Sequence, residues 1–199
     1  TLKLNSTSTD LNYQGRVESV NITNVDNDIP TVSVSSVTVS EASLFAVVQV
    51  SLDITSISAI SFTPTQVDGT ALAGTDTGAG LQYFDGVHWV AVTGAVTIAA
   101  GQTSVLLRTS ITNDTVYEQS ESLSISTGAI TGTVTNAAGA SGTITIKDDG
   151  SSTNVFLDTN NSATPTVGTA DNDTPTISVS GVTVSEASPY AVVRVSIDK

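Results

Sequence analysis

Seven carboxylate side chains lie at the breaks in the alternation of apolar and polar residues. They are Glu41, Asp76, Asp114, Glu118, Glu121, Asp148 and Asp149. Carboxylate oxygens without histidine or cysteine partners select hard cations, and this chain has one histidine and no cysteine. A flexible cage of several acids suits Ca²⁺ better than Mg²⁺, which requires a strict octahedron and retains waters. The residue types predict calcium, with more than one ion, if the fold brings the acids together.

Short β-strands are the elements that would position these acids. Seven segments combine β-branched residues with period-two alternation: 32–39, 46–52, 57–62, 95–98, 105–111, 123–125 and 144–146. They predict an all-β fold, a seven-stranded antiparallel immunoglobulin-like sandwich. In an up-and-down count, the connections that carry the acids all fall at one end, so we expect an acidic pole there. The alternative is that the acids are solvated loop residues that keep the protein soluble.

Composition excludes several classes of function. The 199 residues carry 6 Lys plus Arg against 19 Asp plus Glu, a formal charge of −13. That charge opposes binding to nucleic acid and to anionic membrane surfaces. The absence of cysteine removes disulfides, thiolate zinc sites and thiol nucleophiles. No apolar run could span a bilayer and no leader opens the chain, so we expect a soluble piece whose targeting signal lies elsewhere.

An internal repeat organises the chain. Residues 26–53 return as residues 171–198, with 21 of 28 positions identical at an offset of 145. A tandem array is the expected reading of such a period. The predicted units are the tail of one repeat (1–28), a complete repeat (29–150), a linker or junction (151–175) and the first strands of the next repeat (176–199).

Each copy begins with an Asp-Asn-Asp triplet, and these triplets are candidate junction metal ligands. The acids are Asp26, Asp28, Asp171 and Asp173. Two alignments stay open: the first triplet matches Asp148-Asp149 and the second junction carries an insert, or both triplets are a separate junction feature. In either case a triplet near a neighbour's acidic pole could share its calcium and align adjacent repeats.

One aromatic cluster surrounds an Asp85-Gly86 hairpin signal. Tyr83, His88 and Trp89 are predicted to pack the hairpin onto a sheet, with contact to a glycan or protein partner as the alternative. A lone histidine without a nucleophile elbow does not indicate a catalytic triad. Acids in sandwich loops without an aromatic platform do not indicate a glycosidase. We therefore expect no enzyme.

Five motifs in order resemble the Calx-β family, and especially the repeats of large RTX-type bacterial surface adhesins. They are VTVSEAS (37–43), DGTALAGTD (68–76), IAAGQTS (98–104), ITNDTVYEQSESLSI (111–125) and GTITIKDD (142–149). The resemblance implies a Ca²⁺-binding sandwich whose ligands match the seven acids named above. Two departures are Thr77, where the family often has tyrosine, and Gly150, where it often has a third aspartate.

The function implied is an extracellular, calcium-stabilised structural repeat at the bacterial cell surface, which extends a distal binding domain away from the cell. Its partners would be neighbouring repeats of the same chain. The alternatives are a unit that associates laterally into a surface layer or sheath, and a module that binds a ligand through the 83–89 hairpin.

Overall fold

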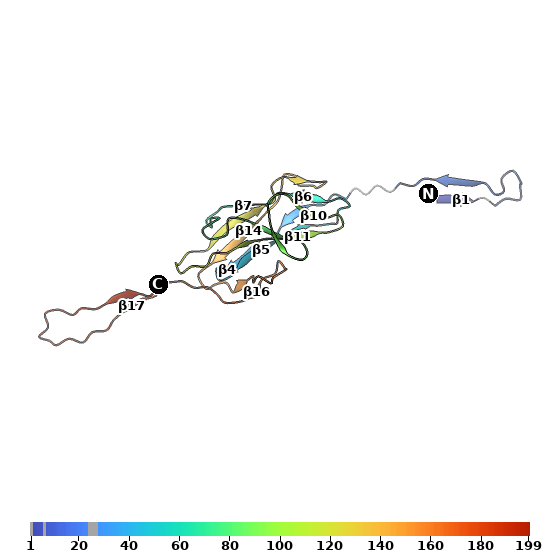
Figure 1. Cartoon of the computed structure of the whole chain (residues 1–199). Helices are drawn as coiled ribbons and strands as arrows, with labels where there is room; N and C mark the ends of the chain where they lie inside the picture. The colour runs from blue at the N-terminus through green and yellow to red at the C-terminus, as the bar shows by residue number, and fades with distance from the viewer. Residues whose placement is uncertain (1, 6, 24–27) are drawn as a thin grey trace.

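The computed structural model describes residues 2–5, 7–23 and 28–199, and all its regular structure is β. The strands are β1 (Leu2–Asn5), β2 (Val17–Val20), β3 (Val32–Val34), β4 (Val37–Ser40), β5 (Phe45–Leu52), β6 (Ile60–Phe62), β7 (Thr65–Val67), β8 (Gln82–Phe84), β9 (Trp89–Ala91), β10 (Val96–Ile98), β11 (Ser104–Ser110), β12 (Glu121–Ser126), β13 (Ile130–Thr131), β14 (Ser141–Lys147), β15 (Asn154–Val155), β16 (Thr166–Val167), β17 (Ile177–Val179) and β18 (Val195–Ile197). Figure 1 shows a central sandwich with a two-stranded hairpin beyond each end.

The sandwich consists of two main sheets. One has the order β3-β5-β11-β8-β9 and the other β4-β14-β12-β7, and β10-β6-β13 forms a smaller third sheet. The predicted all-β sandwich is confirmed. Residues 32–39 were predicted as one strand, but at Ser35-Ser36 a jog takes the chain out of the first sheet, where it forms β3, and into the second, where it forms β4.

The prediction of a wholly antiparallel sandwich was wrong in one strand pair. β4 runs parallel to β14, with Val39 opposite Ile146. The chain keeps one direction from β3 to β4. Its neighbour in the first sheet, β5, runs in the opposite direction, whereas its neighbour in the second sheet, β14, runs in the same direction. Strand period is 2, so the jog at Ser35-Ser36 also decides which side chains face inward.

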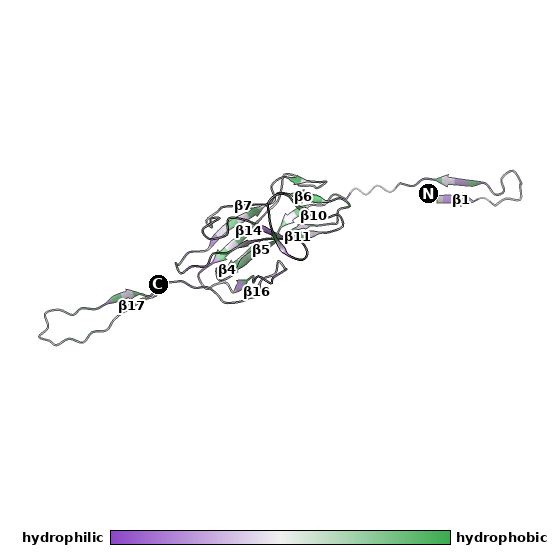
Figure 2. Cartoon of the chain, in the orientation of Figure 1, coloured by the Kyte–Doolittle hydropathy of each residue, from purple (hydrophilic) through white to green (hydrophobic). Residues whose placement is uncertain are grey.

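The core lies between the two main sheets. Its fully buried members include Val39, Val50, Leu107, Leu123 and Ile144. Each comes from an alternating position of its strand, which explains why β-branched and aliphatic residues recur every second residue. Figure 2 shows the apolar residues concentrated on the strands of the sandwich.

Residues 151–170, which we call the strap, differ from the linker that the sequence predicted. Phe156 of the strap is fully buried and belongs to the core cluster. Its backbone N–H donates to Ser43 Oγ at 2.8 Å, and its carbonyl accepts from Leu44 N at 3.2 Å. The strap therefore packs on the complete repeat. The Ser, Thr and Asn content that indicated a linker reflects its exposed remainder.

A hairpin precedes each Asp-Asn-Asp triplet. Strands β15 and β16 pair before residue 171, and strands β1 and β2 pair before residue 26. This order favours the second alignment, in which the triplet is a junction feature separate from Asp148-Asp149. The outer boundaries of the predicted repeats stay predictions.

Candidate metal centre

Strand ends bring the predicted acids to one end of the sandwich, the acidic pole. Glu41 follows β4, Asp148 follows β14 and Glu121 opens β12. The parallel register of β4 and β14 continues beyond the strands, because Glu41 N–H donates to the Lys147 carbonyl at 2.9 Å. Sequence positions more than 100 residues apart thus meet at adjacent strand ends.

The first cluster contains Asp76, Glu118 and Glu121. One carboxylate oxygen from each lies within 4.8 Å of the others. The pKa of Glu121 is raised to about 7, first by burial and then by the charges of Asp76 and Glu118. Burial also raises the pKa of Glu118, and the charges of the neighbouring acids raise it further. Carboxylates this close destabilise each other's charged forms unless a cation lies among them.

The second cluster contains Asp148, Asp171 and Asp173, again with one oxygen from each within 4.8 Å. Asp148 is only 2% exposed, and its Oδ2 accepts from Glu118 N at 2.7 Å while its Oδ1 accepts from Asp173 N at 3.2 Å. Asp148 therefore joins the loop between β11 and β12 to the triplet that follows the strap.

Glu41 lies between the two clusters. It is 4% exposed, and its Oε1 accepts from Asp114 N at 3.2 Å. The pKa of Glu41 is raised to about 7, and burial is the largest cause. The hydrogen bond from Asp114 opposes this shift, but the charges of Asp148, Asp114 and Asp171 add to it. A small cavity at the pole is lined by Glu41 together with Asp76, Glu118, Glu121 and Asp148.

Asp149 lies apart from both clusters. Its Oδ2 is 3.7 Å from Lys147 Nζ, and hydrogen bonds from Ser151 lower its pKa. Gly150, with φ of +72°, then turns the chain into the strap, and a Cβ there would lie 3.2 Å from Asn172 Cβ. The departure from a third aspartate therefore has a steric reason.

The four predicted junction acids lie in different places. Asp171 and Asp173 lie at the pole of the preceding, complete repeat, and Lys199 Nζ is 2.9 Å from Asp173 Oδ1. Asp28 is exposed and belongs to neither cluster. Asp26 lies outside the described residues.

The motif order and this pole point to one family. A model of the Calx-beta domain matches residues 24–150. The chain belongs to the Calx-beta family. Calx-beta domains are non-catalytic, calcium-binding β-sandwich modules, and Ca²⁺ is the cofactor.

Three solved structures are similar to this Calx-beta chain. The calcium binding domain CBD12 of CALX1.1 is 22% identical over 59% of this chain and 44% of that one, with a TM-score of 0.45. CBD12 from CALX1.2 is 23% identical over 58% and 42%, with a TM-score of 0.44. The apo-form Calx CBD1 domain is 20% identical over 59% and 99%, with a TM-score of 0.41. The chain thus spans less than half of the first two structures. The comparison with curated proteins gave no match.

The residues at the pole fit a calcium ion. The donors are carboxylates from five separate segments, with no histidine or thiolate among them. This oxygen-only set is the chemistry of a hard cation.

Within the described part of the chain, no helix is long and apolar enough to span a membrane.

The aromatic cluster divides into separate roles. Tyr83 pairs opposite Leu107 on the sheet, whereas His88 is exposed at the tip of the hairpin. Trp89 packs against Phe84 at 5.4 Å between ring centroids. The hairpin forms the edge of a main sheet, since β8 pairs with β11, and Tyr83 and Trp89 pack against the core.

Sequence reasoning missed Arg108, which holds this region together. Its guanidinium lies 3.7 Å from the Phe45 ring centroid and 4.4 Å from the Trp89 centroid, and Nη1 is 3.2 Å from Asp158 Oδ1 in the strap. Arginine stacked on aromatic rings and paired with a carboxylate makes a well-defined anchor. No local motif predicts the role of Arg108, because its partners come from three distant segments.

Proposed function

We propose that Glu41, Asp76, Asp114, Glu118, Glu121, Asp148, Asp171 and Asp173 hold calcium at two adjoining centres. The observation that carries the proposal is Asp148, a buried carboxylate whose two oxygens contact both the β11–β12 loop and the triplet after the strap. Bound there, calcium supplies the positive charge that these clustered acids lack.

The mechanism is electrostatic cross-linking. Without a cation, buried carboxylates of Glu41 and Asp148 repel the acids around them, and protonation of Glu41 and Glu121 is the remaining relief. With a cation, the ends of β4, β12 and β14 and the triplet are fixed together. Because the triplet leads directly into β17, fixing it also sets the direction in which the next segment leaves the sandwich.

We further propose that this module is a structural repeat of a large extracellular bacterial adhesin, with neighbouring repeats of the same chain as its partners. The 145-residue repeat and the hairpins at both ends of the sandwich support an extended array (Figure 1). The repeat would act as a non-enzymatic extender that holds a distal binding domain away from the cell surface.

Thermal unfolding of residues 1–199 tests the calcium centre. At a free Ca²⁺ of 100 times its Kd, one site adds about 2.7 kcal/mol of stability, which raises Tm by about 5–10 °C for a chain of this size. Excess chelator should reverse the rise, and Mg²⁺ should not reproduce it.

Asp148→Asn and Asp149→Asn form a matched pair for this experiment. Each removes one negative charge at adjacent positions, but only Asp148 belongs to a cluster. We expect Asp148→Asn to remove most of the calcium-dependent rise and Asp149→Asn to preserve it. An equal response of both variants would show that the ion binds elsewhere.

A further inference from the structure

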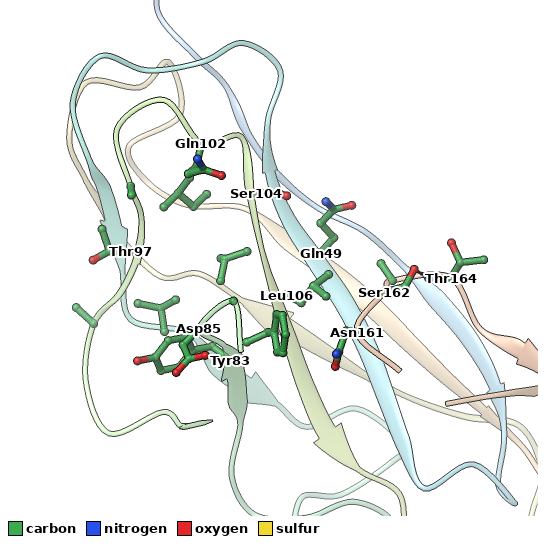
Figure 3. A pocket seen from close by; sticks show the side chains of 18 residues that line it. Gln49, Tyr83, Asp85, Thr97, Gln102, Ser104, Leu106, Asn161, Ser162 and Thr164 are labelled. Carbon is green, nitrogen blue, oxygen red and sulfur yellow. Dashed lines mark hydrogen bonds between the residues drawn. The ribbon is translucent and has the colours of Figure 1, made fainter. Parts of the chain in front are cut away.

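A groove of about 780 Å³ opens on the sandwich and shares no lining residue with the two acidic clusters. Its walls come from the β8–β9 hairpin, the β10 strand with the turn that follows, the start of β11 and the strap. Figure 3 shows Tyr83 and Asp85 on one side, Asn161, Ser162 and Thr164 on the other, and Gln49 and Leu106 between them. The volume is in the range of sites that bind small molecules.

The polar lining of the groove is almost uncharged. Amides are contributed by Gln49, Gln102 and Asn161, and hydroxyls by Thr97, Ser104, Ser162, Thr164 and Tyr83. Amide and hydroxyl groups both donate and accept hydrogen bonds, which matches a ligand whose own groups do both. No lysine or arginine lines the groove, so it offers no countercharge to an anion.

Asp85 is the single charged lining residue, and its carboxylate is already used. Its Oδ1 accepts from Val87 N at 2.8 Å and from His88 N at 2.7 Å, which fixes the tip of the hairpin. These hydrogen bonds lower the pKa of Asp85. A cationic ligand therefore meets one exposed carboxylate that is committed to the turn, rather than a free pair of acids.

The apolar part of the lining alternates with the polar part. The aromatic rings of Tyr83 and Phe84 and the aliphatic side chains of Val105 and Leu106 lie among the amides and hydroxyls. A ligand that matches both the polar and the apolar lining must have hydroxyl groups on its edges and C–H faces that pack on aromatic rings. We propose that this groove binds an uncharged oligosaccharide.

The strap makes the groove specific to the folded repeat. Asn161, Ser162 and Thr164 reach the groove because the strap is held upstream by buried Phe156 and by the ion pair of Asp158 with Arg108. The site therefore combines four segments that are distant in sequence, at residues 49, 83–86, 95–106 and 161–164. It does not depend on the calcium proposal, since none of the clustered acids lines it.

Isothermal titration calorimetry of residues 1–199 with maltohexaose, cellohexaose and chitohexaose tests the proposal, with sialyllactose as the anionic comparison. We expect saturable binding of at least one neutral hexasaccharide and no binding of sialyllactose. Absence of binding to all three neutral sugars, or equal binding of sialyllactose, would overturn the proposal.

Gln102→Leu and Gln14→Leu provide a matched pair of substitutions. Both glutamines are exposed, but Gln102 lines the groove and Gln14 lies on the turn before β2. We expect Gln102→Leu to lower the affinity for the sugar at least about tenfold, because one hydrogen-bonding partner is lost. Gln14→Leu should leave the affinity unchanged. Melting curves equal to that of the parent chain exclude misfolding, and equal affinities of the two variants would contradict the site.

Discussion

Two copies of one sequence occur in different surroundings within this chain. The segments 32–52 and 177–197 both form a hairpin with the same register, since Val32 pairs with Leu52 and Ile177 with Ile197. Their local hydrogen bonds also repeat. Asp53 Oδ1 accepts from Thr31 N at 2.7 Å, and Asp198 Oδ1 accepts from Thr176 N at 2.6 Å. Local sequence is sufficient for the base of the hairpin.

The two copies differ wherever a distant partner is needed. β5 extends over eight residues beside β11, whereas its counterpart β18 has three. Residues 37–40 form β4 beside β14, but residues 182–185 form no strand. Val39 is fully buried and its counterpart Val184 is 47% exposed. An extended strand therefore requires its neighbour's backbone groups and side chains in addition to its own propensity.

The largest expected effect comes from truncating the same core position in each copy. Leu52 is 6% exposed and Ile197 is 59% exposed. Leu52→Ala should lower the free energy of unfolding by about 2–5 kcal/mol through lost burial and a cavity. Ile197→Ala should change it by less than about 0.5 kcal/mol, as at an exposed site. Urea unfolding of both variants measures the difference, and similar losses would mean that the second copy is also packed.

A smaller effect is expected from pH in the absence of calcium. Glu41 and Glu121 have pKa values raised to about 7 from 4.5, so the folded state binds more protons than the unfolded state between pH 4.5 and 7. Stability should therefore fall as pH rises through this window, by on the order of 1–3 kcal/mol. Melting curves in chelator at pH 5, 6, 7 and 8 test this direction.

Glu41→Gln and its counterpart Glu186→Gln separate the pole from the local sequence. Glu41 is buried among acids, whereas Glu186 is exposed in the second copy. The first substitution should flatten much of the pH dependence, and the second should leave it intact. If Glu186→Gln flattened the curve equally, the repulsion assigned to the acidic pole would be wrong.

The smallest effect is expected from placing a residue of one copy at the matching position of the other. Leu44 N–H donates to the strap at the Phe156 carbonyl, whereas its counterpart is Pro189, which has no N–H. Leu44→Pro should cost about 1–2 kcal/mol through the lost hydrogen bond and loosen the strap. Hydrogen exchange of strap amides near Phe156 should quicken in this variant and not in Pro189→Leu. Unchanged exchange in Leu44→Pro would show that the strap does not rely on this contact.

Much of the acidic pole could be predicted because strand parity is a property of the sequence. Alternation located the strands, and counting them placed Glu41, Asp76, Glu118 and Asp148 at one end. The same reasoning could not separate Asp148 from Asp149. Adjacent residues at a strand end point in different directions, and the Gly150 turn together with the Lys147 contact decides which one faces the clusters.

The strap and its groove could not be predicted. Residues 151–170 have the composition of a linker, and only the fit of Phe156 into the core and the contact of Asp158 with Arg108 bind them to the sandwich. Such contacts join residues 50 or more positions apart, and no periodicity encodes them. No sequence motif therefore predicts that Asn161 lines the groove.

The sequence by itself determined the β-strands, the repeat, the Calx-beta family and the oxygen-only chemistry of the pole, because strand period, residue identity and charge are local properties. The tertiary structure alone decided which acids share a cluster, that β4 runs parallel to β14, and that the strap packs against the sandwich. Those features depend on which distant backbones and side chains become neighbours, and neighbours are a consequence of packing the whole core.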